Sequence, residues 1–171
     1  MSIEQAAFWE SHVMFRLLAI VAVLASVMSQ EFRLPEIWAK PVPFFQIQRE
    51  FLAPVSLYGP GHRGLDFVIE DNQDLIAPAA GLIEFSGIVV NRNIVTMKTK
   101  SGYLISFEQV CSPLSPGEPV EQGQVLGQFC SINVDYEQHC DNCVHFSVRG
   151  KHGYLNPELF LGSLLPSVLK A

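Results

Sequence analysis

Short runs in which apolar and polar residues alternate recur along most of the chain. Their period of two residues is that of a strand with one face in a core and the other toward solvent. Clusters of Gly, Pro, Asn and Ser separate the runs, as at Asn91-Arg92-Asn93 and Ser115-Pro116-Gly117. This spacing predicts an all-β fold, either an antiparallel β-sandwich or a half-open barrel. We expect its strands at residues 65–69, 82–85, 94–99, 103–107, 124–129 and 143–148.

Two segments near the ends of the chain depart from this pattern. Residues 157–165 have helical character. Near the N-terminus, an apolar run of about twelve residues from Leu17 to Met28 follows Arg16. That length matches the core of a signal peptide and falls short of the roughly 20 residues of a typical membrane span. We therefore predict an N-terminal signal helix, beginning at Met1 or at a neater start at Met14, with an uncleaved anchor or buried helix as the alternative.

The predicted signal also divides the chain. We expect a signal peptide or signal anchor at residues 1–29, a Pro-rich leader at 30–57, one folded domain at 58–163 and a C-terminal tail at 164–171. A chain of 171 residues has room for one such domain with a sizeable core. Its net charge of -6 argues against a nucleic-acid partner, which calls for a basic patch. The domain is expected to be secreted or extracytoplasmic, with the membrane involved only through an uncleaved N-terminal segment.

Cysteine usage agrees with export. The cysteines are Cys111, Cys130, Cys140 and Cys143, and an even number in an exported chain predicts disulfides. Three pairings are open, and in one of them Cys140 and Cys143 close a tight loop and leave Cys111 with Cys130. The Cys140-x-x-Cys143 spacing also resembles half of a redox or zinc-finger motif, but the chain has no second Cys-x-x-Cys.

Two short segments carry side chains typical of a metal centre. The first is His-Arg-Gly-Leu-Asp at residues 62–66, and the second is Cys-Val-His-Phe at residues 143–146. Two imidazoles and one carboxylate, from His62, His145 and Asp66, are a catalytic zinc arrangement when a fourth position is left for water. On an extended strand His62 and Asp66 would lie roughly 13 Å apart. A turn around Gly64 must therefore fold the histidine back over the aspartate.

Five segments in this order resemble peptidase family M23, the LytM or lysostaphin-like zinc metallopeptidases that cut peptide bonds in bacterial peptidoglycan. They are H-x-x-x-D at 62–66, A-P-x-x-G at 77–87, a glycine-spaced segment at 117–127, an H-x-H-F strand at 143–146 and N-P-x-x-x-L at 156–161. The resemblance covers about residues 58–161. It implies the family's duplicated hybrid-motif fold, a zinc ion held by His62, Asp66 and His145, and peptidoglycan peptides as the substrate.

The chain departs from the family pattern at two site histidines. Cys143 stands in place of the first histidine of H-x-H, and Gln109 in place of the histidine of a Y-x-H-L segment. General acid–base catalysis typically contributes about 10²–10⁴ in rate, so the departure bears directly on activity. The chain is similar to an exported actinobacterial variant of the family with a Cys-x-His ending. That resemblance makes Glu108 and His139 the candidate catalytic residues, although Glu108 should point away from Gln109 unless the strand ends or bulges there.

Two functions therefore stay open. One is an exported zinc metallopeptidase in which a metal-activated water attacks a peptide bond of peptidoglycan cross-link or stem peptides. The other is a catalytically degenerate M23-like module that binds the cell wall or regulates a cell-wall hydrolase. A third alternative, a biotinyl or lipoyl carrier domain, is suggested by the glycine-spaced segments and by Lys98 within Thr-Met-Lys-Thr. Export, the cysteines and the histidine pair argue against it.

Overall fold

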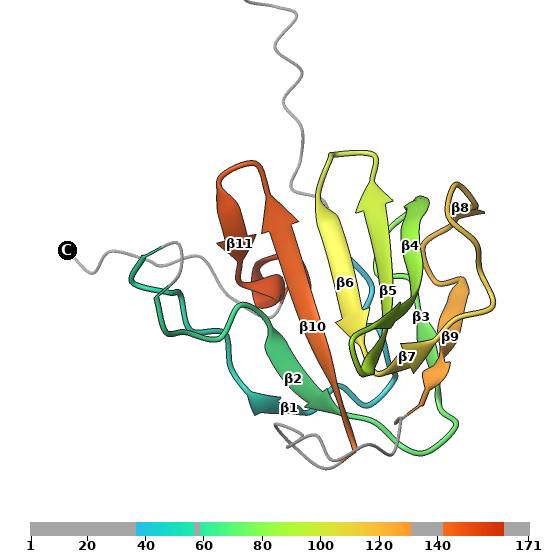
Figure 1. Cartoon of the computed structure of the whole chain (residues 1–171), viewed down its shortest axis with the longest axis horizontal. Coiled ribbons are helices and arrows are strands. Elements are labelled where there is room, and N and C mark those ends of the chain that lie inside the picture. Colours follow the sequence, from blue (N-terminus) through green and yellow to red (C-terminus); the bar gives the residue numbers. More distant parts are fainter. Residues whose placement is uncertain (1–36, 57–58, 131–141, 163–171) are drawn as a thin grey trace, which may run out of the picture. The chain divides into compact units, whose positions relative to one another are not determined.

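The regular structure of the chain is almost entirely β-strand. The computed structural model describes residues 37–56, 59–130 and 142–162, and its strands form a large sheet and a small sheet (Figure 1). One short 3₁₀ helix, η1 (Pro157–Leu159), follows the last strand. The prediction of an all-β antiparallel fold is confirmed, whereas the predicted signal helix lies outside the described residues.

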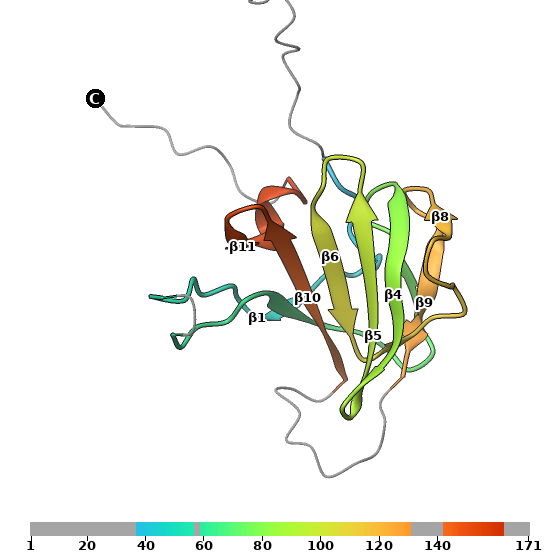
Figure 2. The ribbon, with the colours of Figure 1, turned by 45° about the horizontal axis from the view of Figure 1, so that its top comes forward.

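The large sheet holds eight of the strands found in the described residues. They are β1 (Ile47–Arg49), β2 (Leu65–Val68), β4 (Gly81–Val89), β5 (Arg92–Thr99), β6 (Leu104–Glu108), β8 (Pro119–Val120), β10 (Cys143–Gly150) and β11 (Gly153–Leu155). Their order is β1-β2-β10-β6-β5-β4-β8, and β11 pairs with the C-terminal end of β10. Figure 2 shows β10, β6, β5 and β4 side by side. Strand β10 is thus held on both edges, which makes it a rigid base for a site.

The small sheet consists of β3 (Asp74–Ile76), β9 (Val125–Phe129) and β7 (Val110–Cys111), in the order β3-β9-β7. The chain passes from β6 of the large sheet to β7 of the small sheet through Gln109. This residue adopts a φ of 66°, in the left-handed region that non-glycine residues seldom occupy. Strand β6 therefore ends directly after Glu108, and Gln109 forms the corner between the sheets.

Alternation along the strands decides which side chains form the core. On β10, Val144, Phe146 and Val148 are fully buried, and the Phe146 ring stacks on Phe107 of β6 with centroids 4.8 Å apart. Leu75 of β3 and Leu126 of β9 belong to the same buried cluster. Complete burial of one such side chain contributes about 1.5–3 kcal/mol. The opposite face of β10 carries His145 and is left for polar residues.

The stretch expected as a Pro-rich leader contributes to this fold from residue 37 onward. Trp38 is 2% exposed and stacks on Phe160, with ring centroids 4.1 Å apart. Val42 is fully buried, and β1 pairs with β2. The N-terminal stretch is therefore joined to the site strand β2 by backbone hydrogen bonds as well as by packing.

The sequence-based strand predictions agree with the structure. The six expected segments correspond to β2, β4, β5, β6, β9 and β10. The strands that alternation missed have two or three residues each, too few to show a period. The expected helical tail is represented by η1, and its last residues lie outside the described part. In the described ranges, no helix has the length and apolar character needed to cross a membrane.

Candidate metal centre

His62 is fixed by the N-terminal stretch. Its backbone N–H donates to the carbonyl of Leu52 at 2.8 Å, and its own carbonyl accepts from the Leu52 N–H at 3.0 Å. Its ring Nδ1 lies 2.7 Å from the carbonyl oxygen of Glu50. A carbonyl can only accept, so Nδ1 carries a proton, and Nε2 is the ring nitrogen that faces Asp66 and His145. The buried imidazole is thereby held in the orientation of a metal ligand.

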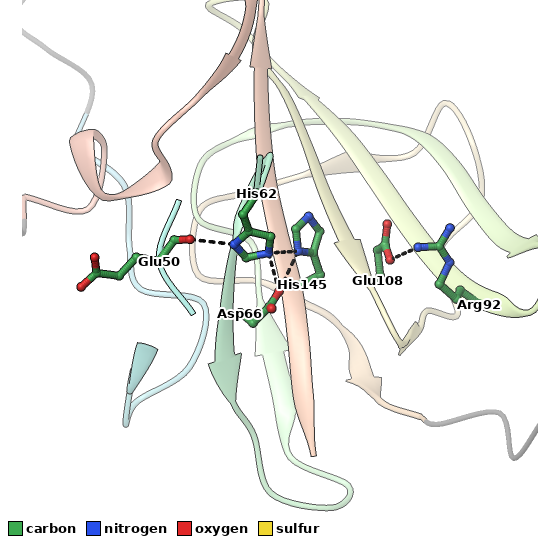
Figure 3. Close-up of polar contacts among 6 residues, drawn as sticks. All are labelled: Glu50, His62, Asp66, Arg92, Glu108 and His145. Atoms are coloured by element: carbon green, nitrogen blue, oxygen red, sulfur yellow. Dashed lines mark hydrogen bonds and ion pairs between the residues drawn. The ribbon is translucent and has the colours of Figure 1, made fainter. Parts of the chain in front are cut away.

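Asp66 and His145 lie directly opposite each other on the paired strands β2 and β10. Opposite residues of an antiparallel pair share one face, and Oδ1 of Asp66 is 2.7 Å from Nδ1 of His145. The same oxygen is 3.1 Å from Nε2 of His62, and the two imidazole nitrogens are 3.2 Å apart. Figure 3 shows the three side chains converging on one point.

Gly64 allows the loop of His62 to pass close to β10. A Cβ at this position would lie 2.3 Å from the carbonyl oxygen of Phe146 and 2.7 Å from Cε1 and Nε2 of His145. Only glycine leaves room for the backbone to approach the imidazole so closely. The turn expected around Gly64 is thus present, and its cause is steric.

The electrostatics of the centre favour an ionised Asp66. Burial of the carboxyl disfavours its charged form, but the hydrogen bond and charge of His145, followed by those of His62, outweigh this effect and lower its pKa below the ordinary value. The side chain is 1% exposed. Its second oxygen, Oδ2, is buried without a hydrogen-bond partner, although a buried carboxylate oxygen normally has one.

The arrangement fits a zinc ion. Zinc binds histidine nitrogen and carboxylate oxygen at about 2.0–2.2 Å, so ligand atoms of a tetrahedral site lie roughly 3.3 Å apart. The distances of 3.1 and 3.2 Å from His62 Nε2 to Asp66 and His145 are close to that value, and the 2.7 Å between Asp66 Oδ1 and His145 Nδ1 is shorter. The unpartnered Oδ2 of Asp66 and the Glu50 carbonyl, which binds Nδ1 of His62 and leaves Nε2 to face the centre, are further features of a metal-binding donor set.

Glu108 lies on the same face, in register with His145 on the neighbouring strand. Because β6 ends at this residue, the alternation of a strand does not fix the direction of the Glu108 side chain relative to that of Gln109. Its Oε2 is 2.6 Å from Nη1 of Arg92 on β5 (Figure 3). His139, the other candidate catalytic residue, lies outside the described residues.

The cysteines flank this region. Cys111 and Cys130 form a disulfide, and Cys143 is also disulfide-bonded and 4% exposed. Its expected partner, Cys140, lies outside the described residues. A cysteine in a disulfide has no thiol proton to exchange, so Cys143 cannot replace the family histidine as a base.

Two elements of the site carried no sequence signal. Arg92 stood in a segment that reads as a turn, and the Glu50 carbonyl is a backbone group with no signature in the sequence. The pairing of β5 with β6 brings Arg92 to Glu108, and the bridge between Leu52 and His62 brings the Glu50 carbonyl to the His62 ring. Lys98, the residue behind the carrier-domain alternative, lies within β5 rather than in an attachment turn and is 3.9 Å from Glu84.

Comparisons with known proteins agree with the fold. Lysostaphin from Staphylococcus simulans superposes with a TM-score of 0.61 at 19% identity, over 76% of this chain and 55% of that one. A zinc-containing peptidase from Vibrio cholerae gives a TM-score of 0.57 at 16% identity, covering 71% of this chain and 39% of that one. A chain of the SpoIIIAH–SpoIIQ complex gives 0.60 at 19% identity, over 72% of this chain and 99% of that one. These likenesses concern the fold alone.

Sequence comparison found relatives and a matching family model. An uncharacterized protein of Mycobacterium tuberculosis strain H37Rv is 30% identical over 81 residues, which are 47% of this chain and 32% of the relative. The chain thus spans about a third of the length of the curated relatives that it matches. The sequence model of peptidase family M23 matches residues 60–157, more than half of the chain and all three residues of the candidate metal centre. The chain belongs to peptidase family M23.

Proposed function

We propose that this chain is an exported zinc metallopeptidase that hydrolyses peptide bonds in the cross-links or stem peptides of peptidoglycan. The observation that carries the proposal is the convergence of His62 Nε2, His145 Nδ1 and Asp66 Oδ1 to pairwise distances of 2.7–3.2 Å. Membership of family M23 and the fold shared with lysostaphin support a wall peptide as the substrate.

In this proposal His62, Asp66 and His145 hold the zinc ion. When bound, zinc polarises a carbonyl as a Lewis acid and lowers the pKa of a coordinated water. The Glu50 carbonyl holds the His62 ring in the required orientation, and the Asp66 carboxylate supplies negative charge from a buried position. His145 is the most exposed of the three, with 21% of its side chain accessible, so substrate would approach from its side.

Glu108 is the proposed proton carrier. Opposite residues of an antiparallel pair have Cβ atoms about 4.5–5.5 Å apart, so its carboxylate extends from a point next to His145. Glu108 would accept a proton from the attacking water and return it to the leaving amine. His139 is the second candidate for this role.

A second function, a non-catalytic module that binds the wall or regulates a wall hydrolase, is favoured by a different observation. Cys143 stands at a family histidine position and is held in a disulfide, and Gln109 occupies the other. Under this alternative the ligand triad still binds metal, but no residue relays the proton.

Zinc content and wall hydrolysis together separate the two functions. The full chain is purified, its zinc is measured by elemental analysis, and crosslinked muropeptides are supplied as substrate. Peptidase function predicts about one zinc per chain and new amine termini in the muropeptides. Stoichiometric zinc without cleavage would favour the module. The absence of both zinc and cleavage would refute the peptidase function. His62→Ala should abolish zinc binding, whereas His152→Ala, in the exposed β10–β11 turn, should not.

Export is part of the same proposal. The signal expected at residues 1–29 would place the folded domain outside the cytoplasm, in the compartment of the wall peptides and of stable disulfides. Expression in a bacterial host with N-terminal sequencing of the mature protein tests it. Cleavage near Ser29 would support a signal peptide, retention in the membrane fraction would support an anchor, and an intact cytoplasmic chain would contradict export.

A further inference from the structure

Arg92 contacts the proposed proton carrier from the strand on the far side of the metal centre. We propose that Arg92 is a positioning residue that fixes the Glu108 carboxylate beside His145, in compensation for the missing family histidines. The inference rests on the proposed function and deepens it, because it assigns a second residue to the proton-transfer step. Arg92 lies outside the motifs that identify the family.

The register of the sheet places the pair. Glu108 lies opposite His145 of β10 on one side and opposite Ile94 of β5 on the other. Arg92 is two residues before Ile94 and so projects from the same face of β5. Figure 3 shows Glu108 between His145 and Arg92. The guanidinium therefore contacts the carboxylate from the side opposite the metal ligands.

The backbone around the pair is fixed as well. Gln109, which ends β6, donates its N–H to the carbonyl of Asn93 at 2.7 Å, and its carbonyl accepts from the N–H of Cys130 at 3.0 Å. Cys130 in turn is joined to Cys111 of β7 by the disulfide. Glu108 and Arg92 thus lie on backbone segments that are hydrogen-bonded to each other.

The pair is partly accessible to solvent. The Arg92 and Glu108 side chains are 29% and 24% accessible. Water that reaches an ion pair screens it and reduces its contribution to folding. A glutamate side chain has several rotatable bonds, however, and an arginine hydrogen bond at 2.6 Å removes much of that freedom. The ion pair therefore mainly fixes the direction of the Glu108 carboxylate.

The two carboxylate oxygens then have different tasks. Oε2 accepts the hydrogen bond from Nη1 of Arg92. Oε1 is left to accept and release the proton of the reaction. The guanidinium has donor atoms only, so it fixes the carboxylate without accepting the proton of the reaction. Lysine, a flexible point charge, would not reproduce this geometry.

A double-mutant cycle on the full chain tests the inference, with wild type, Arg92→Met, Glu108→Gln and the double variant. If Arg92 acts through Glu108, Arg92→Met should lower kcat on crosslinked muropeptides by roughly 10–100-fold, with KM changed less than about twofold. The double variant should be no slower than Glu108→Gln, because the partner through which Arg92 acts is already absent. Arg92→Lys should restore only part of the rate.

A matched control comes from the same strand. Lys98 of β5 lies 3.9 Å from Glu84, so Lys98→Met removes an ion pair of the large sheet away from His145. It should leave kcat unchanged. The inference would be overturned if the losses of kcat in Arg92→Met and Glu108→Gln multiply in the double variant. An equal loss of kcat in Lys98→Met would overturn it as well.

A second readout does not depend on turnover. The chain is loaded with Co²⁺, and its visible absorption bands are recorded at one pH for the four variants of the cycle. Arg92→Met and Glu108→Gln should shift these bands in the same direction, and the double variant should shift them no further. If cobalt binds and the shifts of the two substitutions add, the role of Arg92 is refuted while the proposed function is not. A wild type that binds neither zinc nor cobalt would refute the proposed function and the inference with it.

Discussion

Gly64 offers the sharpest test of the geometry at the metal centre. In Gly64→Ala the added Cβ would meet the carbonyl oxygen of Phe146 at 2.3 Å and the His145 ring at 2.7 Å. Neither group can withdraw unless β2 separates from β10 or the imidazole turns. Overpacking of this kind typically costs about 1–3 kcal/mol. For a domain of this size we expect Tm of the metal-free protein to fall by roughly 3–8 °C.

The same substitution should weaken zinc binding. A rotation of the His145 ring moves Nδ1 away from Asp66 Oδ1, the atom that lies 2.7 Å from it. Disturbing the support of a metal ligand usually costs about 10–100-fold in affinity. Competition with a chromophoric chelator measures the zinc affinity, and differential scanning calorimetry in the presence of a chelator measures Tm.

Two other glycines separate the local effect from a general one. In Gly127→Ala the Cβ would lie 2.2 Å from the carbonyl oxygen of Cys111, a clash of the same size in the small sheet, so stability should fall while zinc affinity is kept. In Gly87→Ala the nearest atom is Cζ of Phe85 at 3.4 Å, and neither quantity should change. Wild-type zinc affinity in Gly64→Ala, or an equal loss in Gly127→Ala, would refute the reasoning.

Three further predictions address the supports of the site. Leu52→Pro removes the N–H that donates to the His62 carbonyl at 3.0 Å, and we expect severalfold weaker zinc binding in the chelator competition with little change in the circular dichroism spectrum. Replacing Cys111 and Cys130 by serine opens a 19-residue loop and should lower the free energy of unfolding by about 3 kcal/mol in urea titrations; an unchanged midpoint would contradict this. Trp38→Ala should lower the free energy of unfolding by about 3–5 kcal/mol in the same titrations. An unchanged free energy of unfolding would show that the N-terminal stretch does not stabilise the core.

The strand pattern and the metal-binding side chains could be predicted from the sequence because both depend on local order. Alternation over five or more residues reports which face of a strand is buried, and it predicted the longer strands. Two-residue strands such as β7 and β8 are too short to carry that signal. The participation of Trp38 in the core was also missed, because a Pro-rich composition says nothing about a stacking partner more than a hundred residues away.

The sequence by itself determined the family, the all-β class and the residue types of the centre, since these depend on motifs and on a two-residue period. Tertiary structure decided the rest. The pairing of β2 with β10 brings Asp66 to His145, and the approach allowed by Gly64 brings His62 to both. Strand order likewise sets Glu108 between His145 and Arg92. Contacts of this kind form between segments distant along the chain, and their register is fixed only when the sheets pack around a common core.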